Sequence, residues 1–345
     1  MGNWKNGELG DFVTLKRGFD LPQQKREDGQ VPIFSSSGIT GTHSTAMVKA
    51  PGVITGRYGT IGEVFYAAKD FWPLNTTLFV EDFHGNDAKF IYYSLKTLEW
   101  SKFTSASAVP GINRNTVHKE IVSLPDIETQ RRIASTLSMF DEKIKINTEI
   151  NDNLQQQAQA IYSSMFIDNP DPAWSHGHLS DLITVKYGKD HKKLADGIYP
   201  VYGSGGIMRY VERPLYNKES VLIPRKGTLN NVMYVNQPFW SVDTMFYTEM
   251  KLPNVAKFVY HFVKAKDLVS MNAGSAVPSM TTDILNAMEV VIPSASALEE
   301  FESLVAPMYE AMEANDVQSK ALSQMRDTLL PKLMSGEIDV SAVQL

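Results

Sequence analysis

Apolar and polar positions follow two different patterns along this chain. In the first pattern, short β-rich apolar runs are separated by turns that contain Gly and Pro, which indicates strands rather than helices. These runs are residues 31–34, 52–55, 63–67, 77–80, 220–224, 231–235 and 245–248. Residues 89–98 and 255–264 resemble short helices. The two regions are therefore predicted to be sheet-rich domains of mixed α+β class.

The second pattern is a heptad repeat that begins after Pro125 and recurs near the end of the chain. Its positions follow alternating steps of four and three, which is the seam of a coiled coil. They are Ile133, Leu137, Phe140, Ile144, Asn147, Asn151, Leu154, Ala158, Ile161 and Met165, and then Phe301, Val305, Met308, Met312, Asn315, Ser319, Leu322, Arg326, Leu329 and Leu333. Both seams are apolar at the ends and polar at the same two central layers. An antiparallel pair of helices would bring those polar layers together.

Two further features describe these helices. Residues 127–166 would form a helix roughly 60 Å long at 1.5 Å per residue. Pro307 lies inside the second helix, where the first has Met139. We therefore expect a kink or a short break at Pro307.

The chain is a tandem repeat. Residues 31–165 align with residues 199–333 at a constant offset of 168, with Arg57 on Arg225 among the matches, and the amino-terminal pieces align at an offset of 170. The predicted divisions are a first domain at 1–125, a central helix at 126–167, a linker at 168–173, a second domain at 174–293 and a second helix with its tail at 294–345. Such internal pseudosymmetry suits a partner that is itself two-fold or bipartite.

Composition narrows the class of protein. An apolar content of 43% and a charged content of 21% are typical of a globular protein. No apolar run approaches the length of a membrane span and no signal peptide is present, so we expect a cytoplasmic protein without membrane contact. The chain has no cysteine, which excludes disulfides and zinc–thiolate sites, and its His residues are scattered, so no metal is expected.

Charge is unevenly distributed. The chain has a net charge of −6, yet residues 1–125 carry 13 basic and 12 acidic residues, and residues 174–293 carry 13 and 10. The two helical segments hold the excess acid. A DNA-binding surface needs a local basic face rather than a basic chain, although these values are also ordinary for a protein surface.

No catalytic motif is recognisable. The segment Gly56–Gly62 resembles a phosphate-binding glycine loop, but its counterpart Pro224–Asn230 keeps the Arg, Gly and Thr and lacks the outer glycines. We therefore interpret both segments as turns between strands, with Arg57 and Arg225 projecting from them. Each arginine could make a structural contact within its own domain or contact a phosphate or base.

Basic and polar residues near the predicted turns are the candidate DNA-binding residues, because their side chains suit phosphates and base edges. In the first copy they are Lys16, Arg17, Lys25, Arg26, Ser36, Arg57, Tyr58, Thr60, Asn75, Asn113 and Arg114. In the second copy they are Lys186, Lys192, Lys193, Ser204, Arg225, Lys226, Thr228, Asn230, Asn231, Thr281 and Thr282. Identical positions should hold the fold or the phosphates. Aligned positions that differ are the candidates for base recognition, such as Tyr58 with Lys226 and Arg114 with Thr282.

These features together match a known family. The first domain closes on Leu124-Pro125 and the second on Ile292-Pro293, and the first is followed by Glu128–Gln130 at the start of its helix. Arg-x-Gly-Thr turns, the Ala108–Pro110 and Ala276–Pro278 segments and the ending Leu329–Asp339 complete the pattern. The whole chain resembles the specificity (S) subunits of type I restriction-modification systems.

This resemblance implies two target-recognition domains held apart by an antiparallel pair of helices that form a coiled coil. Each domain would recognise one half of a split site in double-stranded DNA, and the helices would dock methyltransferase (M) subunits, expected to be two, with restriction (R) subunits joining that core. S-adenosylmethionine and ATP would bind those partners, so no cofactor is expected in this chain. The second helix opens with Ser294–Glu299 where the first has Asp126–Arg131, which makes the methyltransferase contacts less certain there.

Two other interpretations remain. The chain could be a two-fold scaffold that joins two protein partners through its acidic helices without binding DNA. An enzyme acting alone is the third interpretation, and it lacks a motif to support it.

Overall fold

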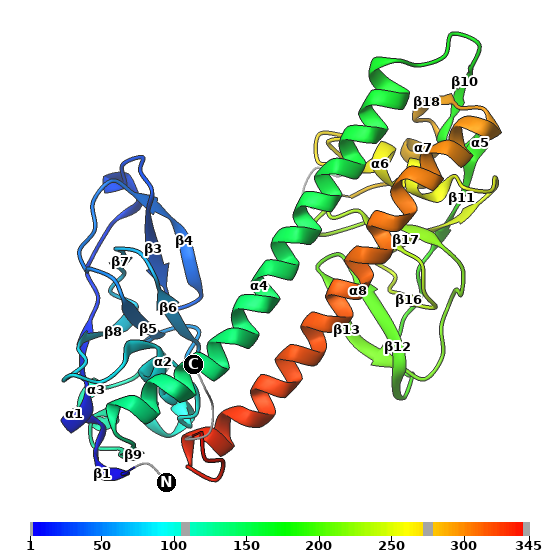
Figure 1. Cartoon of the computed structure of the whole chain (residues 1–345). Coiled ribbons are helices and arrows are strands. Elements are labelled where there is room, and N and C mark those ends of the chain that lie inside the picture. The colour runs from blue at the N-terminus through cyan, green and yellow to red at the C-terminus, as the bar shows by residue number, and fades with distance from the viewer. Residues whose placement is uncertain (1–2, 105–110, 272–278, 341–345) are drawn as a thin grey trace. The chain divides into compact units, whose positions relative to one another are not determined.

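The structure, a computed structural model, describes residues 3–104, 111–271 and 279–340. Contacts divide the chain into two units, Met1–Thr148 with Asp316–Leu345, and Glu149–Asn315. We call them unit 1 and unit 2. Each contains one sheet-rich domain and a part of both long helices, α4 (Ile127–Ser163) and α8 (Ala295–Met334) (Figure 1). The last residues of the first helix, Ser164–Asp168, form a π-helical turn.

The sheet-rich domain of unit 1 is built from nine strands and three short α-helices among the described residues. The strands are β1 (Lys5–Glu8), β2 (Thr14–Arg17), β3 (Val31–Ser35), β4 (Gly38–His43), β5 (Gly52–Gly56), β6 (Val64–Ala67), β7 (Trp72–Pro73), β8 (Thr77–Asp82) and β9 (Ile121–Leu124). The helices are α1 (Leu9–Phe12), α2 (Ala88–Lys96) and α3 (Arg114–Val117), with 3₁₀ turns at Gln23–Lys25 and Trp100–Phe103. The strands form a four-stranded sheet in the order β2-β8-β5-β6, a three-stranded sheet in the order β4-β3-β7, and the pair β1-β9.

Unit 2 repeats this topology. Its elements are β10 (Ser175–His178), α5 (Leu179–Leu182), β11 (Ile183–Tyr187), β12 (Asp196–Gly203), β13 (Gly206–Val211), β14 (Ser220–Pro224), β15 (Met233–Val235), β16 (Trp240–Ser241), β17 (Met245–Met250), α6 (Ala256–Lys264), α7 (Thr282–Asn286) and β18 (Glu289–Ile292). The sheets have the orders β11-β17-β14-β15, β13-β12-β16 and β10-β18. Each sheet matches one in unit 1, strand for strand, so the predicted tandem repeat of α+β domains is confirmed.

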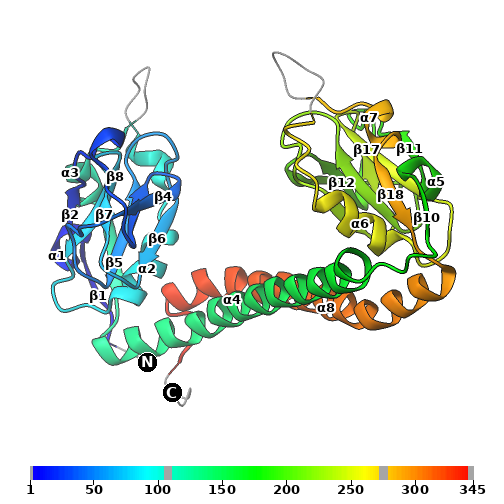
Figure 2. The ribbon, with the colours of Figure 1, turned by 90° about the horizontal axis from the view of Figure 1, so that it is seen from above.

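One short helix in each domain lies between the four-stranded sheet and the long helices, α2 in unit 1 and α6 in unit 2 (Figure 2). In unit 1, Phe90 and Ile91 of α2 share an apolar core with Leu137 of α4 and Leu333 of α8. In unit 2, almost every side chain of α6 is buried. Each long helix therefore forms one wall of the domain cores, which fixes the domain on the helix surface.

Within each unit the two long helices run antiparallel. In unit 1, Arg326 forms an ion pair with Asp141, and Asn147 donates to Ser319 Oγ at 3.1 Å. In unit 2, Asn315 donates to the Asn151 side chain at 2.8 Å. None of the predicted seam positions is exposed. The predicted seam and its two facing polar layers are therefore confirmed.

The expectation at Pro307 was a kink or a short break. The short break is wrong, because α8 is continuous from Ala295 to Met334, and the kink stays a prediction. Pro307 is on the exposed side of α8, whereas its neighbours Phe301 and Val305 are fully buried. A proline removes one helical hydrogen bond. Here that loss falls on the solvent side, while the buried seam holds the helix on both sides of it. Among the residues that the structure describes, no helix has the length and hydropathy to cross a membrane.

The carboxyl-terminal residues of unit 1 fold against its amino terminus. Gly336 has a φ of +74°, and an added Cβ there would lie 2.9 Å from the Trp4 ring. Leu330, Leu333 and Val340 belong to the same apolar core as Leu9 and Phe12. The end of the chain therefore completes the domain with which the chain begins.

Candidate nucleic-acid interface

The turn after β5 and its counterpart after β14 have the same backbone contacts. The Arg57 amide donates to Thr76 O at 2.8 Å, and the Ile112 amide donates to Arg57 O at 3.0 Å. In unit 2, Arg225 donates to Thr244 O at 2.9 Å and accepts from the Met280 amide at 2.9 Å. Each arginine therefore projects from a turn that is fixed on both sides, and the prediction of a turn between strands is confirmed.

A glycine and a serine shape this turn in both copies. Gly59 and Gly227 have φ values of +81° and +86°, a conformation that favours glycine. An added Cβ would lie 3.1 Å from Ser36 Oγ in the first copy and 2.5 Å from Ser204 Oγ in the second. The structure thus places the two predicted serines against the turns, where they have a packing role. Thr60 and Thr228 are exposed on the same turns.

The turn of unit 1 borders a cleft of about 670 Å³ that collects most of the basic candidates of the first copy. Its walls come from the end of β2, the Arg57 turn and the start of α3. The candidates that line it are Lys16, Arg17, Arg57, Tyr58, Asn113 and Arg114. Four of these six side chains are cationic, so the cleft offers a concentrated positive field to an anionic ligand. The predicted segments Ala108–Pro110 and Ala276–Pro278 lie outside the described residues.

Ion pairs within this surface are exposed and leave the cations available. Lys16 pairs with Glu81, and both side chains keep more than two fifths of their surface exposed. Lys186 in unit 2 pairs with Glu249 at 3.6 Å with similar exposure. Exposed pairs of this kind contribute only about 0–1 kcal/mol. A phosphate can therefore replace the carboxylate at little cost.

The corresponding surface of unit 2 has the same backbone turns but different side chains. Lys186 and Arg225 take the places of Lys16 and Arg57, and the Arg225 guanidinium lies 5.3 Å from the Tyr187 ring centroid. In unit 1 the Arg57 guanidinium lies 4.5 Å from the ring centroid of Tyr58. Lys226 occupies the position of Tyr58. The backbone of Lys226 forms an isolated β-bridge with Ser279, as that of Tyr58 does with Gly111. The aligned turns thus present different side chains in the same backbone setting.

Two candidates for base recognition serve as helix caps. Asn113 accepts from the Asn115 amide at 3.0 Å, and Thr281 accepts from the Ile284 amide at 3.3 Å. Thr282 follows as the first residue of α7. Asn113 and Thr281 therefore have the same structural function although they differ in type, because both residues cap helices well. Only the Asn113 amide group remains to contact a base from this site.

Arg114 is positioned by the strand beneath it. Its Nη1 donates to Leu15 O at 3.4 Å, and the Leu15 amide donates to His118 Nε2 at 2.9 Å. Burial lowers the pKa of His118, and the nearby Arg114 charge lowers it further. His118 is therefore neutral at pH 7 and accepts the Leu15 hydrogen bond.

The remaining candidates do not line the cleft. Lys25 ends an exposed 3₁₀ turn, Arg26 is half-buried, and Lys192 and Lys193 are exposed on a turn after β11. Asn75 donates to Asp20, Asn230 donates to Asp267 at 3.3 Å, and Asn231 donates to Ser204 O at 2.8 Å. These three asparagines have structural partners within their own domain.

Sequence reasoning missed the two glutamates that pair with the lysines. Glu81 and Glu249 occupy aligned positions on β8 and β17, opposite the strands that carry Lys16 and Lys186. The pairing depends on strand register, which the sequence does not display. Glu81 and Glu249 are identical residues at the repeat offset of 168, and this identity is the sequence signal that could have identified them.

The fold and these surfaces define a class of protein, a recognition module present in two copies and built on an antiparallel helix pair. A family model described as the type I restriction modification DNA specificity domain matches residues 1–156 and 173–301. The chain belongs to this family of type I restriction-modification specificity subunits. Membership in this family confirms the prediction of a non-catalytic specificity subunit. It favours this interpretation over a scaffold that does not bind DNA and over an enzyme acting alone.

Individual relatives agree with this assignment. A putative type I specificity subunit of Mycoplasma pneumoniae is 27% identical over 364 residues, covering 96% of each chain. The MjaIX specificity subunit of Methanocaldococcus jannaschii is 24% identical over 301 residues, covering 73% of this chain and 69% of its own. The crystal structure of an S subunit from M. genitalium has a similar fold, with a TM-score of 0.64, 20% identity and 96% coverage of both chains.

Proposed function

We propose that each unit of this specificity subunit binds one half of a bipartite site in double-stranded DNA. The single observation that carries this proposal is the cleft of unit 1, where Lys16, Arg17, Arg57 and Arg114 meet. Unit 2 presents Lys186, Arg225 and Lys226 on the matching backbone. Cations on fixed turns are suited to phosphate contacts, which set the position of a protein on the duplex.

Discrimination between the half-sites would come from aligned positions that differ in chemistry. Tyr58 and Lys226 are both exposed on equivalent turns, and Arg114 is aligned with Thr282. An arginine can bind guanine through two hydrogen bonds, and a threonine contacts bases less selectively. We therefore propose these two pairs as the principal base-recognition positions, with the remaining candidates of both copies as secondary contacts.

The long helices would dock methyltransferase subunits, two in number, and restriction subunits would join that core. The two helical segments are acidic, with net charges of −4 over residues 126–173 and −6 over residues 294–345. Their outward faces are thus unsuited to DNA and suited to protein partners. S-adenosylmethionine and ATP would be bound by those partners, which supply the chemistry of methyl transfer and cleavage.

Single arginine substitutions test the two half-sites. Arg57→Ala is expected to weaken binding to a duplex with the full target by about 1–3 kcal/mol, and so is Arg225→Ala. The target is first identified by mapping the positions that the wild-type complex methylates. Binding is then measured by gel shift with the intact target and with duplexes in which one half-site or the other is scrambled.

Because these arginines position each unit on the duplex, each variant should respond less than the wild-type chain to scrambling of one half-site only, and the two variants should differ in which half it is. The two substitutions serve as matched controls for each other. Wild-type affinity and specificity in both variants would contradict the assignment of these arginines. A complex with methyltransferase that has no sequence-specific duplex affinity would contradict the proposed function itself.

A further inference from the structure

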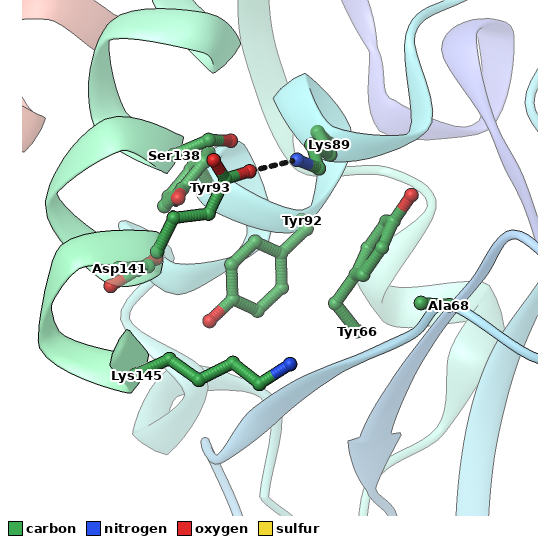
Figure 3. Close-up of a pocket in the computed structure, with 9 residues that line it drawn as sticks. Tyr66, Ala68, Lys89, Tyr92, Tyr93, Ser138, Asp141 and Lys145 are labelled. Carbon is green, nitrogen blue, oxygen red and sulfur yellow. Dashed lines mark hydrogen bonds and ion pairs between the residues drawn. The ribbon is translucent and has the colours of Figure 1, made fainter. Parts of the chain in front are cut away.

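Unit 1 has a second hollow of about 320 Å³, which shares no lining residue with the basic cleft (Figure 3). It opens between α2, the end of β6 and α4. The rings of Tyr66 and Tyr92 border it and meet edge to face, with centroids 5.9 Å apart. Tyr93, Ser138 and Asp141 line the side formed by α2 and α4. Three tyrosine rings thus form part of the wall of this pocket, beside the charged side chains of Lys89, Asp141, Glu142 and Lys145.

The repeat shows what fills the same place in unit 2. Tyr309 occupies the position aligned with Asp141 and is 92% buried, with 8% of its surface exposed. Its ring centroid lies 4.9 Å from that of Tyr234 and 6.3 Å from that of Tyr260, the counterparts of Tyr66 and Tyr92. Its hydroxyl lies 3.0 Å from His261 Nε2. A tyrosine side chain is therefore the group that these aromatic walls accommodate.

The aligned lysines Lys257 and Lys89 also differ in environment between the two units. Lys257 of unit 2 is directed inward, with 6% of its side chain exposed, and pairs with Glu219 and Glu302. Its counterpart Lys89 is 41% exposed and pairs with Glu142 at 3.2 Å. The two glutamates correspond to Pro51 and Ala134 in unit 1. Unit 1 thus keeps the tyrosines that correspond to Tyr234 and Tyr260. It lacks the tyrosine and the inward-directed lysine that close the pocket in unit 2.

A polar group for a phenol hydroxyl is present in the open pocket. Ser138 is 6% exposed, and its Oγ lies near the Tyr93 phenol without a hydrogen bond of good geometry. The Tyr93 hydroxyl donates instead to Asp141 Oδ2 at 2.6 Å. Ala306 stands at the Ser138 position in unit 2. Ser138 Oγ is enclosed beside the Tyr93 phenol, so the acceptor that the pocket offers to a ligand hydroxyl is the Asp141 carboxylate, whose side chain is 30% exposed.

We propose that this pocket of unit 1 receives a tyrosine side chain of a docked methyltransferase subunit, in the place that Tyr309 occupies in unit 2. The inference rests on the proposed docking of such subunits along the long helices. Tyrosine is frequent among the residues that dominate the energy of protein interfaces, and it does so by filling pockets of this kind. The Asp141 carboxylate would accept a hydrogen bond from the hydroxyl of the incoming ring.

The surroundings favour a protein as the source of the tyrosine. A neighbouring hollow of about 210 Å³ follows the same face of α4 on the other side of the Lys89–Glu142 ion pair, lined by Arg131, Ser135 and Met139 among others. Met139 is 57% exposed. The two hollows form a row along one helix, which suits an extended partner surface better than an isolated small molecule.

The test fills the pocket from within. Asp141→Tyr reproduces the residue of unit 2, and Ala68→Trp blocks the mouth without removing a side-chain hydrogen bond. Asp28→Tyr, at an exposed position in the turn before β3 and outside both long helices, is the matched control. Binding of the methyltransferase subunit of the same system to the full-length chain is measured by calorimetry, and p-cresol is titrated by NMR as a tyrosine side-chain probe.

We expect both filling variants to lower methyltransferase affinity at least tenfold and to abolish cresol binding, while Asp28→Tyr leaves both unchanged. Wild-type affinity for methyltransferase in both filling variants would overturn the inference, and so would a wild-type chain that does not bind cresol. A wild-type chain that binds cresol at this pocket but no methyltransferase subunit would contradict the proposed docking function, and with it the assigned source of the tyrosine. Circular dichroism of each variant establishes that it is folded.

Discussion

Lys257→Ala is expected to lower the free energy of unfolding of unit 2 by about 3 kcal/mol. The ammonium group lies 3.3 Å from Glu219 and 2.6 Å from Glu302, and it faces the rings of Tyr234 and Tyr309. Its removal leaves two carboxylates without their cation beside a buried aromatic cluster. We expect the lower end of the range for buried pairs, because Glu219 and Glu302 keep 36% and 25% of their side-chain surface exposed.

The repeat provides the control for this variant. Lys89→Ala removes the aligned lysine of unit 1, whose ion pair with Glu142 is exposed, and it should cost less than about 1 kcal/mol. Urea unfolding gives the total change, and hydrogen exchange of peptides from α6 and α2 assigns it to a unit. Equal effects of the two substitutions would show that the burial of Lys257 does not matter for stability.

Acidification from pH 6.5 to 4 is expected to remove about 3 kcal/mol of stability from unit 2 through His261 alone. Burial lowers the pKa of this histidine to about 4. Its Nδ1 lies 2.8 Å from Gln159 Oε1, and its Nε2 lies 3.0 Å from the Tyr309 hydroxyl. The folded pKa is below the usual value of about 6.5, so the unfolded chain binds the proton first as the pH falls. Stability is therefore constant above pH 6.5 and lost below it.

His261→Gln isolates this contribution, because glutamine keeps hydrogen-bonding capacity and does not titrate in this range. The variant should be less stable at pH 7.5, and its stability should fall less steeply between pH 6.5 and 4.5 than that of the wild-type chain. Carboxylates such as Glu219 and Glu302 titrate in both proteins, so the difference between the two pH profiles belongs to His261. Parallel profiles would mean that the pKa of His261 is the same in the folded and the unfolded chain.

The long helices were the most predictable part of the fold. A heptad seam depends only on which positions are apolar, and the facing of Asn151 with Asn315 followed from the repeat and an antiparallel direction. Pro307 misled the prediction because the effect of a proline depends on which side of the helix it occupies. That side becomes known only when the packing of α8 is known.

The candidate site was predictable in part. The turn with Arg57 and the segment with Arg114 are far apart in sequence, and the structure brings them to one cleft. The sequence supplied residue types suited to DNA, and the aligned copies separated shared positions from divergent ones. It did not show that Asn113 and Thr281 cap helices, because a cap requires the exact start of a helix.

The pocket of unit 1 could not be predicted from residue types. Tyr92 and Tyr260 match between the copies, yet one is half-buried and the other buried. The difference arises from the aligned pair Asp141 and Tyr309, whose importance is evident only when α4 and α8 are seen against α2 and α6. The alignment of the two copies identifies the tyrosines that both sites share. Only the three-dimensional packing shows that the pocket is open in unit 1 and filled in unit 2.

The contact of the carboxyl-terminal residues with the first domain has a consequence for synthesis on the ribosome. Unit 2 is continuous, from Glu149 to Asn315, so all its residues are available before translation ends. The core of unit 1 includes Leu330, Leu333 and Val340, which follow unit 2 in the chain and are translated after it. Domains generally fold as units once their chain is available. Unit 1, whose first segment is translated before unit 2, therefore completes its core only after unit 2 has been translated.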